Sequence, residues 1–258
     1  MKKKDRLDYI GRQLALKSMV TIRELSEELA VSTMTVRRDL QDLAKDGILK
    51  LIPGGAVLQR ESSLINQQEY AITRAKSQMT KEKIKICKKA ASLIQPEDTI
   101  IIDTGSTTEH LPGFIPQSPR LTIVCYSLNI LLNVYNHHKN SQIIFPGGYF
   151  HENTLMFESS ESITLIRKIR ANKAFISAAG VEEKLGVTCA NFYEVGTKRA
   201  AIESSDVKIL LVDSTKFDRV TIAHFANLEE FDIVITDAGI PEKYLKILTK
   251  SNIEHYIV

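Results

Sequence analysis

The amino-acid sequence predicts an α/β protein in two parts, a small N-terminal part and a larger part built on a largely parallel sheet. Residues 1–60 show short amphipathic helices followed by a Pro-Gly-Gly turn. Beyond residue 81, apolar runs of strand length alternate with amphipathic stretches of helix length. Residues 59–80 are polar with scattered apolar positions. We therefore expect a first domain over 1–58, a linker over 59–80 and an α/β domain over 81–258.

Three helices are expected before residue 45. Arg6–Ala15 places apolar residues on one helical face, and Thr21 with Glu24 forms a capping box for a second helix. The pattern breaks at Val31 and resumes over Thr33–Ala44. A short helix, a tight turn and a second short helix form the helix-turn-helix, which projects its second helix into the major groove of DNA.

A β-hairpin is expected directly after these helices. Two short apolar runs flank Pro53-Gly54-Gly55, and such a turn between apolar runs is typical of a hairpin. A hairpin at this place is a wing, so the first domain is predicted to be a winged helix-turn-helix.

The larger part shows seven strand-like runs and five helix-like stretches. The expected strands are Thr99–Asp103, Leu121–Cys125, Gln142–Phe145, Ala174–Ser177, Ile209–Val212, Asp232–Thr236 and His255–Val258. The expected helices are Lys81–Ile94, Ser127–Tyr135, Ser160–Arg170, Tyr193–Ser204 and Pro241–Ser251.

The charge is distributed unevenly along the chain. The 258 residues carry 34 Lys+Arg and 31 Asp+Glu, and residues 1–60 hold 12 of the basic and 8 of the acidic ones. The excess positive charge thus lies in the first quarter, where we expect a polyanionic partner.

The composition favours a globular cytoplasmic protein without a cofactor. Cys87, Cys125 and Cys189 have no CxxC spacing and are interpreted as reduced, buried thiols. The six histidines show no metal-ligand spacing, and neither a membrane span nor a secretory signal is expected.

The third helix has the residues of a DNA-reading element. Its cap is expected at Ser32 or Thr33, where backbone amides suit a phosphate oxygen. With Val36 and Leu40 facing inward, the groove side would present Thr33, Thr35, Arg37 and Arg38. Arginine pairs bidentately with guanine, and small hydroxyl groups fit beside bases or phosphates.

At these residues the chain resembles a known family. VSTMTVRRDLQDLAKDGIL followed by PGGA is similar to the N-terminal motif of the DeoR family of bacterial repressors of sugar metabolism, over about residues 3–57. The resemblance implies that Thr33–Ala44 is the recognition helix and that Arg37 and Arg38 contact DNA. The wing departs from the family pattern, because Leu51, Ile52 and Pro53 stand where a basic residue, one more residue and His are usual. Lys50 is the candidate substitute for that basic residue.

A second group of polar residues follows the expected strands. Thr99–Asp103 leads into Thr104–Thr108, a Gly/Ser/Thr loop before an expected helix, which suits an anion. Small and polar residues also follow other strands, at 126–129, 146–148, 178–180 and 213–216. Because parallel strands end at one edge of their sheet, these residues predict a ligand crevice.

These motifs are similar to the sensor domain of the same family over residues 81–239, which resembles the sugar-phosphate isomerase/CoA-transferase fold. The resemblance implies that the loop holds a phosphate, that Asp103 serves a sugar hydroxyl or the loop itself, and that Lys216 supplies a cation. The expected effector-binding residues are Asp103, Thr104, Gly105, Ser106, Thr107, Thr108, Ser127, Asn129, Gly147, Gly148, Lys198 and Lys216.

An enzyme is the alternative that the resemblance raises. The isomerases have an Asp-Gly-Ala-Asp loop and a later catalytic Glu, whereas the corresponding loop here is Ala179-Gly180-Val181-Glu182, and Lys198 falls near the Glu position. Proton abstraction next to a carbonyl needs a base of that kind. We therefore expect no catalytic residues and favour a regulator over an isomerase with a DNA-binding head.

The expected function is that of a homo-oligomeric regulator, dimeric or tetrameric, that binds double-stranded operator DNA and is released by a phosphorylated sugar. Repression is favoured, although an activator can use the same parts. The effector, the operator and the regulated genes are not encoded in these patterns.

Overall fold

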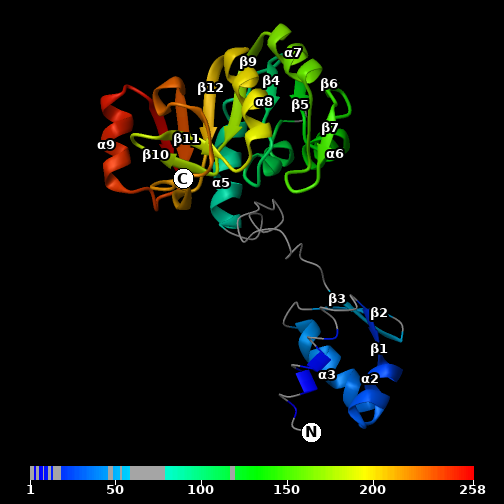
Figure 1. Cartoon of the computed structure of the whole chain (residues 1–258). Coiled ribbons are helices and arrows are strands. Elements are labelled where there is room, and N and C mark those ends of the chain that lie inside the picture. The colour runs from blue at the N-terminus through cyan, green and yellow to red at the C-terminus, as the bar shows by residue number, and fades with distance from the viewer. Residues whose placement is uncertain are drawn as a thin grey trace. The chain divides into compact units, whose positions relative to one another are not determined.

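The structure is a computed structural model that describes residues 19–45, 49–52, 54–58, 79–116 and 120–258, and a few positions before residue 14. The chain divides into two compact units, Met1–Gln68 and Glu69–Val258, each described by itself (Figure 1). The division falls inside the stretch interpreted as a linker, of which only Met79 and Thr80 are among the described residues.

The first unit contains the predicted helices and hairpin. Its elements are β1 (Met19–Thr21), α2 (Ile22–Leu29), α3 (Thr33–Lys45), β2 (Leu49–Ile52) and β3 (Gly55–Leu58). The described positions between 3 and 13 are helical, in the region where the first helix is expected. Sequence analysis missed β1, because three residues are too few to show an alternating pattern. This strand pairs antiparallel with β3, which also pairs with β2.

Two side-chain interactions, one local and one between distant residues, fix the helices of this unit. Thr21 and Glu24 form the predicted capping box of α2. The carboxylate of Asp39 in α3 is buried and accepts two hydrogen bonds from the guanidinium of Arg6, at 2.7 and 3.2 Å. Because Val36 and Leu40 are buried in the core of the same unit, α3 is held from two sides.

The second unit contains a seven-stranded, entirely parallel sheet. Its order is β15-β14-β12-β9-β4-β5-β6. The strands are β4 (Thr99–Ile102), β5 (Thr122–Cys125), β6 (Gln142–Ile144), β9 (Ala171–Ser177), β12 (Ser205–Leu211), β14 (Ile233–Thr236) and β15 (Glu254–Ile257). All seven predicted strands are present, with small differences at their ends.

Helices cover both faces of this sheet. They are α5 (Thr80–Ala91), α6 (Leu128–His137), α7 (Ser160–Lys168), α8 (Phe192–Glu203) and α9 (Glu242–Lys250). One buried cluster joins the sheet to α5 and α6, and the other joins it to α7, α8 and α9. The inner strands β4, β5 and β14 are buried on both faces, which is why their sequences are continuous apolar runs rather than alternating ones.

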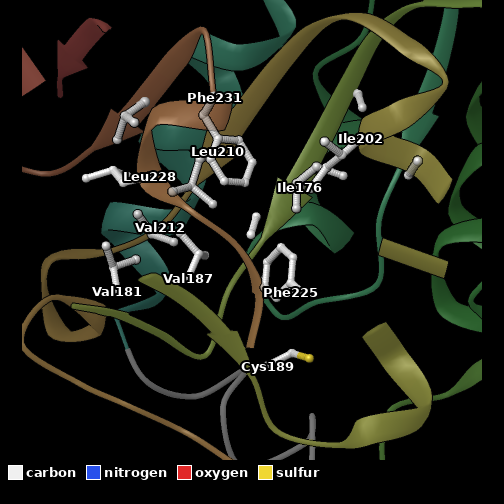
Figure 2. Close-up of a cluster of buried hydrophobic side chains, with 14 of the residues drawn as sticks. Ile176, Val181, Val187, Cys189, Ile202, Leu210, Val212, Phe225, Leu228 and Phe231 are labelled. Atoms are coloured by element: carbon white, nitrogen blue, oxygen red, sulfur yellow. The ribbon is translucent and has the colours of Figure 1, made fainter. Parts of the chain in front are cut away.

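Two small antiparallel sheets were not predicted. One is the hairpin of β7 (Tyr149–His151) and β8 (Met156–Glu158); the other joins β10 (Gly180–Glu182), β11 (Gly186–Cys189) and β13 (Ala223–Ala226). Figure 2 shows Val181, Val187 and Phe225 of the second small sheet in the apolar cluster that also contains Val212 and Leu228. All three cysteines are buried and free. None of the described helices is long and apolar enough to cross a membrane.

Two neighbouring glycines of the wing turn test the packing of the first unit. A Cβ on Gly55 would lie 2.2 Å from the carbonyl oxygen of Val20, whereas a Cβ on Gly54 would meet nothing within 4 Å. Gly54 has φ +84°, so alanine there costs about 1–2 kcal/mol of backbone strain alone. We predict that Gly55→Ala lowers the free energy of unfolding of this unit by about 3 kcal/mol or more. This loss should exceed the loss in Gly54→Ala. Chemical denaturation of the full chain measures both variants, and equal costs would contradict the packing of β1 on β3.

Candidate effector cavity and DNA-binding surface

A cavity lies at the carboxyl ends of three neighbouring strands, β4, β9 and β12. Residues from the loops after these strands line it together with residues of the small strands and of α8. They are Thr104, Gly105, Ser106, Thr107, Thr154, Ser177, Ala178, Ala179, Cys189, Ala190, Glu194, Lys198 and Lys216. This is the edge of the sheet at which the sequence predicts a ligand crevice.

The Thr104–Thr107 loop is held by hydrogen bonds from four directions. The hydroxyl of Thr104 donates to the carbonyl of Thr154 at 3.1 Å, and the hydroxyl of Ser177 donates to the carbonyl of Thr104 at 2.6 Å. The thiol of Cys87 donates to the carbonyl of Thr107, and Nζ of Lys83 donates to the hydroxyl of Ser106 at 3.0 Å. A loop fixed in this way presents its amides and hydroxyls without further ordering, which lowers the entropic cost of binding.

Asp103 organises the wall behind this loop. Its carboxylate is fully buried and accepts hydrogen bonds from the hydroxyl of Tyr126 at 2.6 Å and from Nζ of Lys198 at 2.5 Å. The backbone amide of Ser177 also donates to it at 2.8 Å, and the hydroxyl of Ser177, which donates to Thr104, lies 3.1 Å from it. Burial and the neighbouring Asp103 charge raise the pKa of Tyr126 well above its ordinary value. Asp103 therefore joins β4, β5, β9 and α8.

Lys198 is bonded to residues of this wall. Besides Asp103, its Nζ donates to the carbonyl of Ser177 at 3.1 Å. Burial opposes its charge, but the attraction of Asp103 and Glu194 outweighs burial and raises the pKa of Lys198. Lys198 lines the cavity as a cation already matched by a carboxylate.

Two other lysines lie near the carboxylate of Asp213. Nζ of Lys83 and Nζ of Lys216 each lie 3.9 Å from Oδ2 of Asp213. That oxygen accepts no hydrogen bond from any described residue. Burial is the main cause that lowers the pKa of both lysines. A bound anion would offset the cost of burying the charged ammonium group, so the part of the cavity lined by Lys216 is suited to a phosphate.

The structure brings together half of the predicted effector residues. Those that line the cavity are Thr104, Gly105, Ser106, Thr107, Lys198 and Lys216. The others lie outside the lining. Asp103 and Thr108 bond within the wall, Ser127 is buried, Asn129 donates to Glu109 at 2.8 Å, and Gly147 and Gly148 lie between β6 and β7.

The helix expected after the loop is a short 3₁₀ helix, Thr108–Gly113, which contains Pro112. The helix macrodipole needs several aligned peptide units, so six residues in this form supply little of it. The case for an anion at the loop consequently depends on hydroxyls, backbone amides and lysines rather than on a helix terminus.

Sequence analysis missed several lining residues, and Glu194 is the most informative. Its carboxyl group is almost fully buried, and the loop compared with the isomerases offers no carboxylate here, because Glu182 accepts from the amides of Lys184 and Leu185. Glu194 precedes Lys198 by one helical turn and caps α8 together with Asn191. The signal available in the sequence was this Asn-x-x-Glu capping pattern, which marks a helix start and not a cavity. Among the described residues, no His, Cys, Asp and Glu group is placed to hold a metal ion.

In the first unit, α3 presents a polar face. Ser32 caps the helix, with its hydroxyl accepting from the amide of Thr35 at 3.2 Å. Thr33, Arg37 and Arg38 are exposed, and Thr35 is half-buried. Val36 and Leu40 face the core as predicted. The two arginines are therefore placed on a side of α3 from which a DNA groove can be reached.

The wing places Lys50 in β2, opposite Val57 of β3. Leu51 is 45% exposed at the position where the DeoR motif usually has a basic residue, and Pro53 lies outside the described residues. The exposed apolar side chain confirms that this wing differs in character from a basic one.

The architecture defines a class of protein, a transcription regulator with a helix-turn-helix domain and a ligand-sensing α/β domain. Residues 6–62 match the DeoR-like helix-turn-helix domain, and residues 78–238 match the DeoR C terminal sensor domain. The chain belongs to the DeoR family.

Relatives similar over nearly their whole length carry names of repressors. The deoxyribose operon repressor of Escherichia coli (strain K12) is 30% identical over 245 residues, covering 95% of this chain and 94% of the relative. The lactose phosphotransferase system repressor of Lactococcus lactis subsp. lactis is 36% identical over 248 residues, covering 95% of each.

Solved structures show partial likeness in fold. Ribose 5-phosphate isomerase A of Methanocaldococcus jannaschii is 15% identical with a TM-score of 0.40, covering 52% of this chain and 53% of the isomerase. The delta subunit of eIF2B from Chaetomium thermophilum is 16% identical with a TM-score of 0.45, covering 61% and 56%. Neither likeness carries a functional argument.

The Asp103 network yields a stability prediction. Asp103→Asn keeps the shape of the side chain but leaves Lys198 without its nearest counter-charge, so we expect the free energy of unfolding to fall by about 3–5 kcal/mol. Tyr126→Phe removes one hydrogen bond to the same carboxylate and should cost about 1 kcal/mol. In Asp103→Asn with Lys198→Met, part of the loss should be recovered. Denaturant unfolding measures these variants together with the wild type and with Lys198→Met alone, and strictly additive losses in the double variant would show that the pair is not coupled.

The face of α3 yields a binding prediction. Arg37→Ala and Arg38→Ala should each weaken operator binding by about 1–3 kcal/mol if the arginine reads a base. An arginine that contacts only phosphate should instead lower the slope of log K against log salt by about one unit. Arg23→Ala in α2 removes the same charge outside the recognition helix and serves as the control. Unchanged operator affinity in the double Arg37, Arg38 variant would rule out α3 as the recognition helix.

Proposed function

We propose that this DNA-binding regulator represses a carbohydrate operon in the cytoplasm and leaves its operator when a phosphorylated sugar occupies the cavity. The observation that carries the proposal is that the Thr104–Thr107 loop and Lys216 line the same cavity. Hydroxyls and backbone amides bind phosphate oxygens, and a partly buried ammonium group supplies the opposite charge. The names of the relatives, two repressors of sugar operons, support the same conclusion.

The division of labour within the chain forms part of this proposal. Residues 1–58 bind DNA, 59–80 connect, and 81–258 bind the effector. Ser32, Thr33, Thr35, Arg37, Arg38 and Lys50 are the proposed DNA contacts. Of the effector residues, Gly105, Ser106, Thr107 and Lys216 are proposed to touch the phosphate, whereas Asp103 holds the wall and so acts on the ligand through Ser177 and Lys198.

The functional unit is proposed to be a homo-oligomer. One recognition helix reads few base pairs, so selective binding to a genome needs at least two heads on repeated or palindromic half-sites. Release then follows if the ligand binds more tightly to the arrangement of heads that does not fit the operator.

We predict that Lys216→Ala and Thr107→Ala leave operator affinity nearly intact and weaken release by the effector at least tenfold, because both remove phosphate contacts but no DNA contact. Candidate sugar phosphates and the corresponding free sugars are titrated against operator-bound protein, with fluorescence anisotropy of the DNA as the readout. Lys208→Ala, a half-exposed lysine of β12 away from the lining, is the control.

Two results would refute the proposed function. One is release of DNA by free sugars as effectively as by their phosphates. The other is a normal response in both variants. Turnover of any of these sugar phosphates by the protein would favour the isomerase alternative instead.

A further inference from the structure

The residues that line the cavity carry charges of both signs. Nζ of Lys216 lies 3.9 Å from the carboxylate of Asp213. Lys198 lies between two carboxylates, those of Asp103 and Glu194. With these three groups ionised, the surroundings of Lys198 carry an excess negative charge. An anionic group of a ligand is therefore favoured beside Lys216 and disfavoured beside Glu194.

Glu194 is the acidic residue among those that line the cavity. Its Oε1 accepts hydrogen bonds from the backbone amide of Asn191 at 3.0 Å and from the side-chain amide of Asn191 at 2.9 Å. These two bonds fix the orientation of the carboxylate at the start of α8. Its Oε2 lies 3.8 Å from Nζ of Lys198, beyond hydrogen-bond distance, and accepts no hydrogen bond from the described residues. One oxygen is thus anchored, and the other has lone pairs available in a cavity-lining side chain.

Lys198 does not cancel this charge, because its nearest partners are elsewhere. Its Nζ lies 2.5 Å from Asp103 and 3.1 Å from the carbonyl of Ser177. Asp103 is fully buried behind the wall, so the carboxylate that a ligand meets is that of Glu194. Burial raises the pKa of Glu194 against the opposing effects of Lys198 and Asn191, which marks a desolvated carboxyl group.

An ionised carboxylate accepts hydrogen bonds but donates none. A ligand hydroxyl therefore satisfies it, whereas a second phosphate or a carboxylate would bring like charges together in a desolvated site, which is strongly unfavourable. We propose that Glu194 is a specificity-determining residue that limits the effector to sugars with one phosphate and a hydroxyl group that reaches Glu194, and excludes sugar bisphosphates and phosphorylated sugar acids. This inference rests on the proposed function, because it takes the phosphate to lie near Lys216.

The test compares binding of four probes to the full chain at pH 8 by calorimetry. The probes are inorganic phosphate, fructose 6-phosphate, fructose 1,6-bisphosphate and 6-phosphogluconate. The wild-type protein should bind the monophosphate at least tenfold more tightly than the bisphosphate and the sugar acid. In Glu194→Gln the preference should shrink at least tenfold, since the amide keeps the size of the side chain and removes its charge. Glu203→Gln, an exposed position at the other end of α8, should keep the wild-type preference.

Equal or tighter binding of the bisphosphate by the wild-type protein would overturn the inference, and that measurement does not depend on whether a variant folds. An unchanged preference in a folded Glu194→Gln variant, with thermal unfolding as the check, would overturn it as well. In both cases the proposed function stands, because phosphate compounds still bind. If no probe binds to any of the three proteins, inorganic phosphate included, the assignment of a phosphate site near Lys216 is wrong. The proposed function then fails together with the inference.

Discussion

The arrangement of the second unit around the cavity depends on the interactions of the buried Asp103 carboxylate. It ends a central strand of the sheet, and its buried carboxylate is bonded to Tyr126 after β5, to Ser177 at the end of β9 and to Lys198 in α8. A buried charge is tolerated only when its partners are held in good geometry, so each of these elements is fixed relative to the others. The Thr104–Thr107 loop inherits this rigidity, because Ser177 also bonds to the carbonyl of Thr104. The shape of the cavity thus depends on the hydrogen bonds that the Asp103 carboxylate accepts.

The elements of the fold follow from the sequence because strong periodic signals mark them. A strand buried on both faces reads as a continuous apolar run, as in Thr99–Ile102, and an amphipathic helix has its own period, as in Glu242–Lys250. The short strands were not predictable for the opposite reason. β7, β8 and β10 have three residues each, and their pairing depends on contacts with distant parts of the chain.

The candidate site was predictable in part, and the limit is physical. The Thr104–Thr107 loop and Lys216 follow strands, so topology alone brings them to one edge of the sheet. Whether a polar side chain there faces the ligand or the wall depends on its partners. Asp103 was expected to serve a sugar hydroxyl or the loop itself, and in the structure its carboxylate is bonded within the wall. Glu194 was not singled out, because its Asn-x-x-Glu pattern marks a helix start, yet it lines the cavity. Asn129 donates a hydrogen bond to Glu109, and no local sequence pattern predicts this pairing.

The contact between Lys83 and Ser106 separates two tasks that a regulator has to perform. Lys83 belongs to α5, the first described helix after the stretch that joins the two units, and it supports the loop without appearing among the cavity-lining residues. Substitutions at lining positions such as Thr154, Ala178 or Ala190 would change the shape of the cavity and leave this hydrogen bond in place. The residues that support the loop and the residues that shape the cavity are therefore, in this case, different ones, and each set can vary without the other.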